Sequence, residues 1–420
     1  MNPLPLVLGE LRRGRAAGLA VTLLIALAVC LGVAVSAQER ALRRSSAAAA
    51  APFDLIIGAP GSPTQLVLTT VYLQPAALEL VAGSVLQRLQ GDTGVAYAAP
   101  IAFGDFYRGF PIVGTTGDLV TAGGTRPLAA GRVFEGVHEA VIGAAVALAP
   151  GDSFEPVHGA AGSADESRVH HGFKYTVTGR MARLGTPWDR AILVPVEAMW
   201  RVHALPSGHE ATAAVAQGEH ASAAPGEDED AIRIGPPWLG DAVPGTPGIV
   251  VKPKTVADAY RLRGAYRSGG TTALFPAEIL VALYATLGDA RDVLAWIAVA
   301  TQALVIAAVL LAVFAVIAAR RQQLAVLRAL GASRGFVFAC VWLHVMAMIV
   351  AGAVAGLALG WIAAALLGHF VELRTGLAVG VALGGDEFAM VGALVALGCL
   401  LAVLPALVSY RQPVAAGLRA

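Results

Sequence analysis

Four long stretches of this sequence contain no Asp, Glu, Lys or Arg, and they constrain the fold more than any other feature. They are residues 16–38, 293–319, 335–371 and 388–410. About 20 apolar residues suffice for a helix to cross a bilayer, and a charge at the centre of such a helix costs roughly 2.5–3.5 kcal/mol. The sequence therefore predicts an α-helical integral membrane protein with four transmembrane helices, one near the start and three near the end.

The third stretch is too long for one span, so we expect the chain to leave the membrane before its end. The predicted order is a cytoplasmic amphipathic lead-in at 1–15, spans at 16–38, 293–319, 336–364 and 388–410, an external domain at 39–290, a cytoplasmic helix at 320–335, a short external loop at 365–387, and a cytoplasmic tail at 411–420. For the first stretch, a cleaved signal peptide is the alternative, because arginines precede it and Val35-Ser36-Ala37 resembles a cleavage site.

Arginine sets the predicted orientation. Arg320, Arg321, Arg328 and Arg334 lie in the loop between the second and third spans, whereas the 365–387 loop contains only Arg374. Cytoplasmic loops carry an excess of basic residues, so this loop and both termini are expected inside. The net charge of +1 gives no reason to expect a nucleic-acid partner.

The external domain has a mixed α/β pattern. Short apolar runs predict strands near 53–58, 95–103, 140–147, 175–178, 191–196 and 248–251, and helices are expected at 64–90, 253–267 and 276–292. Residues 204–247 are rich in Ala, Gly, Pro and acidic residues, which favours a flexible surface insertion.

Several chemistries are missing from the sequence. It contains no Gly-Lys dipeptide, so it has no P-loop for a nucleotide phosphate. Gly331-Ala332-Ser333-Arg334-Gly335 matches the G-x-S-x-G pattern of a nucleophile elbow, but that motif requires a strand before the serine, and here a helix and turn are expected. We therefore expect no catalytic residue and no cofactor bound by this chain.

The loop between the second and third spans has the most specific pattern. An amphipathic helix is predicted there, with leucines on one face and arginines seven residues apart, and its key residues are Arg320, Arg321, Gln323, Leu324, Leu327, Arg328, Leu330 and Gly331. A basic loop that only sets topology is the simpler alternative. The segment resembles the R-R-x-E-[IL]-[AG]-x-L-R-A-x-G-A motif of ABC-transporter permeases of the MacB–FtsX type. Gln323 stands where that family usually has an acid, which puts any ion pair of that acid in doubt.

Other parts of the chain support the resemblance. The basic lead-in at 11–15 and the closing x-P-x-x-x-L-R pattern at 411–419 both resemble those of the family. Four motifs of the outer domain follow the family's order of strands, and they lie at 131–134, 139–143, 175–180 and 189–195. The arrangement of one span followed by three also fits the family.

The resemblance implies a permease subunit in a bacterial inner membrane, with its large domain in the periplasm. The 320–335 helix would dock on a separate cytoplasmic ATPase, which would bind ATP and Mg²⁺. A homodimer, and a periplasmic partner or a cargo such as a peptide, drug or lipoprotein, are further expectations. The alternative is a membrane-anchored periplasmic receptor or scaffold without an ATPase, with a possible link to metal; a periplasmic enzyme is the least supported.

Two smaller patterns concern packing and metal. Gly352, Gly356 and Gly360 recur every four residues in the third span, a spacing that lets helix backbones approach closely. Histidines gather in the outer domain, and His203, His209 and His220 are weak candidates for loose Zn²⁺ binding, although they lack the spacing of a tight site.

Overall fold

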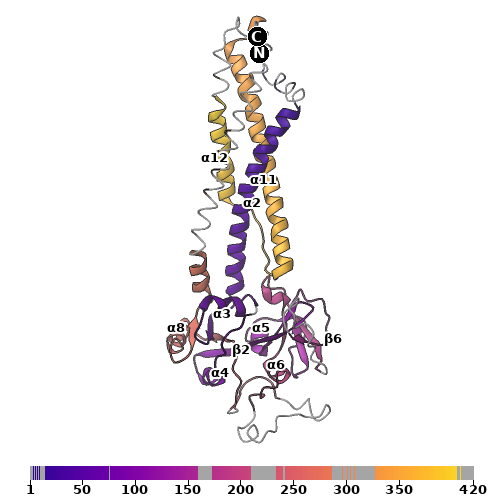
Figure 1. Ribbon diagram of the computed structural model, residues 1–420, viewed down its shortest axis with the longest axis vertical. Coiled ribbons are helices and arrows are strands. Elements are labelled where there is room, and N and C mark those ends of the chain that lie inside the picture. Colours follow the sequence, from indigo (N-terminus) through magenta and orange to yellow (C-terminus); the bar gives the residue numbers. More distant parts are fainter. Residues whose placement is uncertain are drawn as a thin grey trace. The chain divides into compact units, whose positions relative to one another are not determined.

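In a computed structural model of the chain, residues 15–74, 76–158, 173–209, 233–239, 242–285 and 328–403 are described, together with a few single positions. The chain divides into two compact units, shown in Figure 1. The helical unit comprises Met1–Arg43, Leu287–Phe370 and Val379–Ala420. The sheet unit comprises Arg44–Thr286 and Val371–Ala378.

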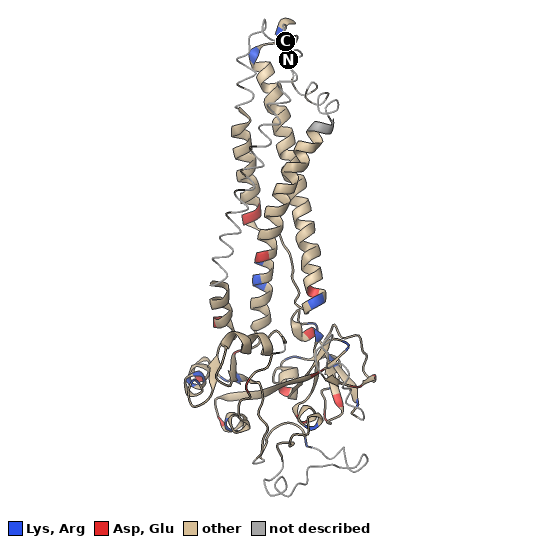
Figure 2. Ribbon diagram, viewed as in Figure 1, with Lys and Arg blue, Asp and Glu red and all other residues tan. Residues whose placement is uncertain are grey.

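Three long helices are described in the helical unit. They are α2 (Arg15–Ala50), α11 (Arg334–Thr375) and α12 (Gly385–Leu401). The first two are long and apolar enough to cross a membrane, and they coincide with the first and third predicted spans. Figure 2 shows α11 without charged residues between its two ends. Most of the predicted second span lies outside the described residues, so the number of four spans stays a prediction.

Helix α11 is longer than the expected third span. It continues to Thr375, and α12 already begins at Gly385, so much of the expected 365–387 loop is helical. Gly376 ends α11 in the left-handed conformation, at φ +74°, and its N–H donates to Glu372 O at 2.8 Å. The helix persists because no Pro or Gly lies between Gly368 and this stop.

The sheet unit is built on eleven strands in the order β11-β1-β10-β2-β3-β9-β5-β8-β4, with β6 paired to β8 and β7 paired to β2. Their bounds are β1 Leu55–Gly58, β2 Val95–Tyr107, β3 Phe110–Thr115, β4 Leu128–Gly131, β5 Glu139–Ile142, β6 Ser153–Phe154, β7 Val157–His158, β8 Tyr175–Met181, β9 Ile192–Pro195, β10 Gly248–Pro253 and β11 Thr272–Leu274. The β3–β9 and β5–β8 pairs are parallel and the others are antiparallel. The mixed α/β domain is therefore as predicted.

Both faces of the central strands are buried. In β1, Ile56 packs into one hydrophobic cluster, whereas Leu55 and Ile57 pack into another on the opposite face. Strand β10 alternates in the same way, with Val250 on the first side. Burial on both sides explains why these strands are continuous apolar runs, and why they could be recognised in the sequence.

Short helices cover the sheet, and one predicted helix is interrupted. The helices are α3 Pro63–Thr70, α4 Gly83–Gly91, α5 Gly117–Thr121, α6 Val196–Val202 and α8 Val256–Ala265, with a 3-10 turn at Pro187–Arg190. The single helix expected over 64–90 is wrong. Leu73 turns into the left-handed region at φ +53°, and Val81 forms a β-bridge with Thr246, so α3 and α4 are separate.

The expected flexible insertion at 204–247 contains a packed segment. Trp238 is only 1% exposed and its indole N–H donates to Glu197 Oε1 at 2.6 Å. Its ring lies edge-on to Trp200, with the centroids 6.0 Å apart. The central part of the insertion, residues 210–232, lies outside the described residues. The end of the segment therefore forms part of the core, and Trp238, the one Trp between residues 204 and 247, was the overlooked signal.

Candidate functional site

The predicted coupling helix is described at its C-terminal end. Leu330 N–H donates to Val326 O at 2.9 Å, and Gly331 N–H donates to Arg328 O at 3.1 Å, which is a closing helical turn. Gly331 has φ +98°, so the helix ends there. The remaining predicted residues of this segment, Arg320, Arg321, Gln323, Leu324 and Leu327, lie outside the described residues.

A second helix begins immediately after this stop. Ser333 Oγ accepts a hydrogen bond from Phe336 N–H at 3.2 Å, as an N-cap does at the start of α11. The G-x-S-x-G sequence is thus a turn between two helices, and its serine closes the first turn of α11. The strand that a nucleophile elbow requires is not found in this part of the described chain.

Apolar side chains on this turn are open to solvent. Leu330 is 80% exposed and Val326 is 47% exposed. Exposed apolar groups beside arginines are suited to docking against a partner protein. We call Val326 together with residues 328–333 the coupling turn.

The glycine repeat of α11 lies against α2. A methyl group on Gly352 would be 2.7 Å from Ile25 Cβ, and one on Gly356 would be 2.6 Å from Ala26 O. At Gly360 the nearest atom would be Cys30 O at 2.8 Å. The partner of this face, which the sequence could not identify, is therefore the first predicted span of the same chain.

A buried ion pair joins α2 to the start of α12. The Glu387 side chain is fully buried and accepts hydrogen bonds from Arg40, from Ser36 Oγ at 2.8 Å and from Gly384 N–H at 2.8 Å. Removing one member of a buried pair costs roughly 3–5 kcal/mol because the other charge is left uncompensated. Glu387 lies at the end of the predicted 365–387 loop, and no pattern in the sequence indicates this role.

The end of α11 belongs to the sheet unit. Arg190 Nη1 donates to Leu373 O at 2.8 Å, and Ala378 N–H donates to Gly185 O at 2.9 Å. Ser45 Oγ also donates to Ala378 O, at 2.7 Å. Side-chain and backbone hydrogen bonds thus hold residues 371–378 within the sheet unit.

Asp189 holds the 184–189 loop, which is hydrogen-bonded to the segment after α11. Its carboxylate accepts hydrogen bonds from Leu184 N–H at 2.8 Å and from Gly185 N–H at 2.7 Å. Burial raises the pKa of the Asp189 carboxyl, and these two donors oppose that shift. The loop is therefore held by backbone bonds to one carboxylate.

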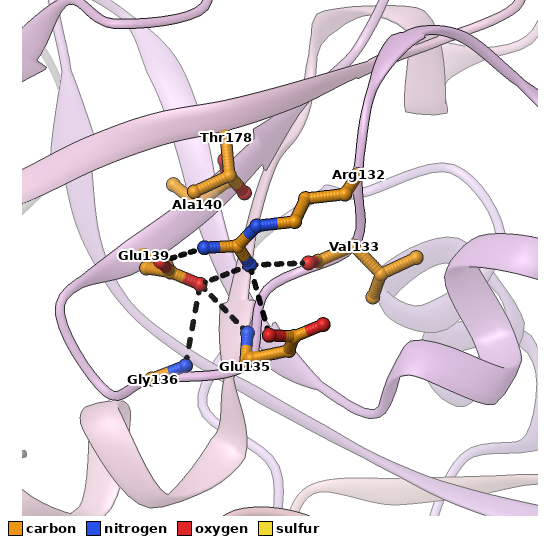
Figure 3. A network of polar contacts seen from close by, with 7 residues as sticks. All are labelled: Arg132, Val133, Glu135, Gly136, Glu139, Ala140 and Thr178. Atoms are coloured by element: carbon orange, nitrogen blue, oxygen red, sulfur yellow. Dashed lines mark hydrogen bonds and ion pairs between the residues drawn. The ribbon is translucent and has the colours of Figure 1, made fainter.

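The outer-domain motif around residues 131–143 forms a compact polar network, shown in Figure 3. Arg132 binds Glu139 through two hydrogen bonds, of 2.7 and 2.5 Å. Glu139 Oε2 also accepts from Glu135 N–H at 2.7 Å and from Gly136 N–H at 3.3 Å. The Arg132 hydrogen bond lowers the pKa of Glu139, and the backbone donors add to this against the opposing effect of burial. The network fixes the connection between β4 and β5.

The two predicted metal candidates that the structure describes, His203 and His209, lie beside different partners. His209 Nε2 lies 3.7 Å from Glu197 Oε1, and His203 lies instead beside Asp105 and His158. His220 lies outside the described residues.

Comparison with known proteins finds a family match for the C-terminal part of the chain. Residues 296–414 match the family described as FtsX-like permease C-terminal. This part of the chain is therefore similar to the C-terminal domain of FtsX-like permeases. The match covers the coupling turn, α11 and α12, and it confirms the predicted resemblance to permeases of the MacB–FtsX type.

Solved structures of outer domains are also similar. One is the periplasmic region of MacB from Actinobacillus actinomycetemcomitans, at 9% identity and a TM-score of 0.32, covering 56% of this chain and 95% of that one. Another is the extracellular domain of the noncanonic ABC-type transporter YknZ from Gram-positive bacteria, at 13% identity and a TM-score of 0.27, covering 53% and 98%. Comparison with curated proteins finds no match.

Proposed function

We propose that this FtsX-like permease transmits the ATP cycle of a separate cytoplasmic ATPase to its sheet unit. The observation that carries the proposal is the continuity of α11. It begins at Arg334, directly after the coupling turn, and its last residues are bonded into the sheet unit. With 42 residues at about 1.5 Å each, such a helix is about 60 Å long.

The coupling turn is the proposed docking site of the ATPase. Its exposed Leu330 and Val326 would enter a groove of that subunit, with the arginines of 320–334 at the rim. ATP and Mg²⁺ would be bound by the ATPase, since this chain has no P-loop. The glycine contact with α2 and the Glu387 pair with Arg40 would keep the helices together during the movement.

The remaining features complete the proposal. The chain would cross a bacterial inner membrane four times, with 320–335 and both ends in the cytoplasm and the sheet unit in the periplasm. It would act as a homodimer; because α2 already fills the glycine face of α11, another face would form the dimer contact. The sheet unit would move a periplasmic partner or a cargo such as a peptide, drug or lipoprotein.

A pull-down tests the docking site. We expect Leu330→Asp to abolish co-purification of an ABC-type ATPase, because a carboxylate cannot enter an apolar groove without losing its water. Leu239→Asp is the matched control, since Leu239 is 76% exposed on the sheet unit, and it should leave association unchanged.

Two outcomes would count against the proposal. Equal association of the Leu330→Asp and wild-type chains would remove the docking role of the coupling turn. A wild-type chain that associates with no ATPase would instead favour the receptor or scaffold.

A further inference from the structure

Three potential metal ligands meet in the sheet unit, away from the features described above. They are Asp105 on β2, His158 on β7, and His203 directly after α6. One ligand atom from each lies within 4.8 Å of the other two. The three residues are far apart in sequence and come from three different elements.

Strand pairing places the first two ligands. The β2–β7 register sets Asp105 opposite His158, so both side chains stand on the same face of the sheet. His158 Nδ1 lies 3.2 Å from Asp105 Oδ1. A shift in the β2–β3 register between Phe103 and Asp105 marks a bulge, a feature that often re-aims a side chain.

A missing side chain makes room for the third ligand. A methyl group on Gly104 would lie only 2.3 Å from His203 Nε2, so any larger residue there would push the imidazole away. The His203 ring stands at 73° to the ring of His158, with the centroids 5.4 Å apart. The backbone of His203 is fixed by its N–H bond to Met199 O at 3.3 Å.

The surroundings favour a cation. The Asp105 side chain is fully buried, and a carboxylate withdrawn from water needs compensating charge or hydrogen bonds. The His158 side chain is 39% exposed and His203 is half-buried, so the histidine side is open to small solutes.

We propose that Asp105, His158 and His203 bind a divalent transition metal, with Zn²⁺ as the best match. Two imidazole nitrogens and one carboxylate oxygen are a donor set that zinc accepts, with a fourth position left for water or a bound ligand. Calcium and magnesium prefer oxygen ligands alone. Tetrahedral ligands at about 2.0–2.1 Å from zinc lie roughly 3.3 Å apart, close to the Asp105–His158 separation. A small movement of His203 completes the set.

Metal binding by the full-length chain in detergent tests the site. The protein is stripped with a chelator, and Co²⁺ is added while the visible absorption of tetrahedral cobalt is followed; Zn²⁺ is then titrated to displace it. We expect binding at micromolar metal. Replacing a ligand in His158→Ala or His203→Ala should weaken metal binding by at least 10–100-fold, because loss of a group that only orients a ligand already has an effect of this size.

Gly104→Ala provides a sharper variant, because it removes no ligand and only displaces His203. It should weaken metal binding while leaving the circular dichroism and melting temperature near those of the wild type. His138→Ala and His209→Ala are matched controls for histidines of the same unit, and replacing His170, His171 and His220 together controls for binding elsewhere in the sequence.

The proposal is overturned if the wild type binds neither ion at micromolar concentration. It is also overturned if His158→Ala and His203→Ala bind as the wild type does, or if the control variants lose the metal equally. These outcomes are independent of ATPase docking.

Discussion

At the scale of single residues, the described chain uses buried or multiply bonded acids to fix its connections. Glu387 ties α12 to α2, Asp189 holds the loop that receives α11, and Glu139 fixes the turn before β5. Each carboxylate accepts backbone N–H bonds in addition to any charged partner. Where the folded state lowers the pKa of such an acid, as it does for Glu139, the stabilisation is complete only while the carboxylate is ionised.

The Arg132–Glu139 pair makes a pH-dependent prediction. Since the folded state lowers the pKa of Glu139, its stabilising effect is complete above the unfolded value of about 4.3 and is lost as pH falls through the folded pKa. Glu139→Gln should therefore lower the melting temperature slightly at pH 7 and much less at pH 3. The effect is small because Arg132 is half exposed and water screens the pair.

Tryptophan fluorescence of the sheet unit measures this difference during thermal unfolding. Glu135→Gln is the control, because Glu135 is 79% exposed and lies 3.7 Å from Arg132. Equal destabilisation by Glu139→Gln at both pH values would show that the carboxylate charge is irrelevant.

At the scale of elements, the sequence predicted the strands with a continuous apolar pattern. It did not predict clusters whose residues are far apart in the chain. Strands β1 and β10 were recognisable because both faces are buried and their residues are continuously apolar. Strand β7 has two residues and β11 has three, too few for a pattern. The Asp105, His158 and His203 cluster depends on strand register and on the end of α6, which no local spacing encodes. Glu387 was visible only as a charge beside an apolar run.

Replacing a glycine by alanine should change stability in opposite directions at the α2–α11 contact and at an open position of α12. Gly356→Ala should destabilise the helical unit by roughly 1–3 kcal/mol, because its methyl group would lie 2.6 Å from the backbone oxygen of Ala26. Gly392→Ala in α12 has no atom within 4 Å of the new methyl group, so it should stabilise by up to about 1 kcal/mol through helix propensity. Melting temperatures in detergent provide the measurement. If both substitutions shift the melting temperature in the same direction, close packing of these backbones is not the cause.

At the scale of the whole molecule, the proposed mechanism depends on α11 as one uninterrupted helix. Val354 lies near its middle and is 63% exposed, so replacing it disturbs little packing within the chain. Val354→Pro removes a helical hydrogen bond and kinks the helix, at a cost of about 3 kcal/mol or more. We expect the variant still to bind the ATPase, because the coupling turn is untouched, but to lose the nucleotide-dependent change in the sheet unit.

Hydrogen exchange measures this uncoupling, with the complex compared in the presence and absence of a non-hydrolysable ATP analogue. Val354→Ala keeps the helix and should respond as the wild type does. If Val354→Pro retains the full nucleotide-dependent change in the sheet unit, movement does not pass along α11. Helix α2, which also continues into the sheet unit as far as Ala50, would then be the remaining described route. A Pro in the middle of α2 would then show whether the movement passes along α2 or along the second predicted span.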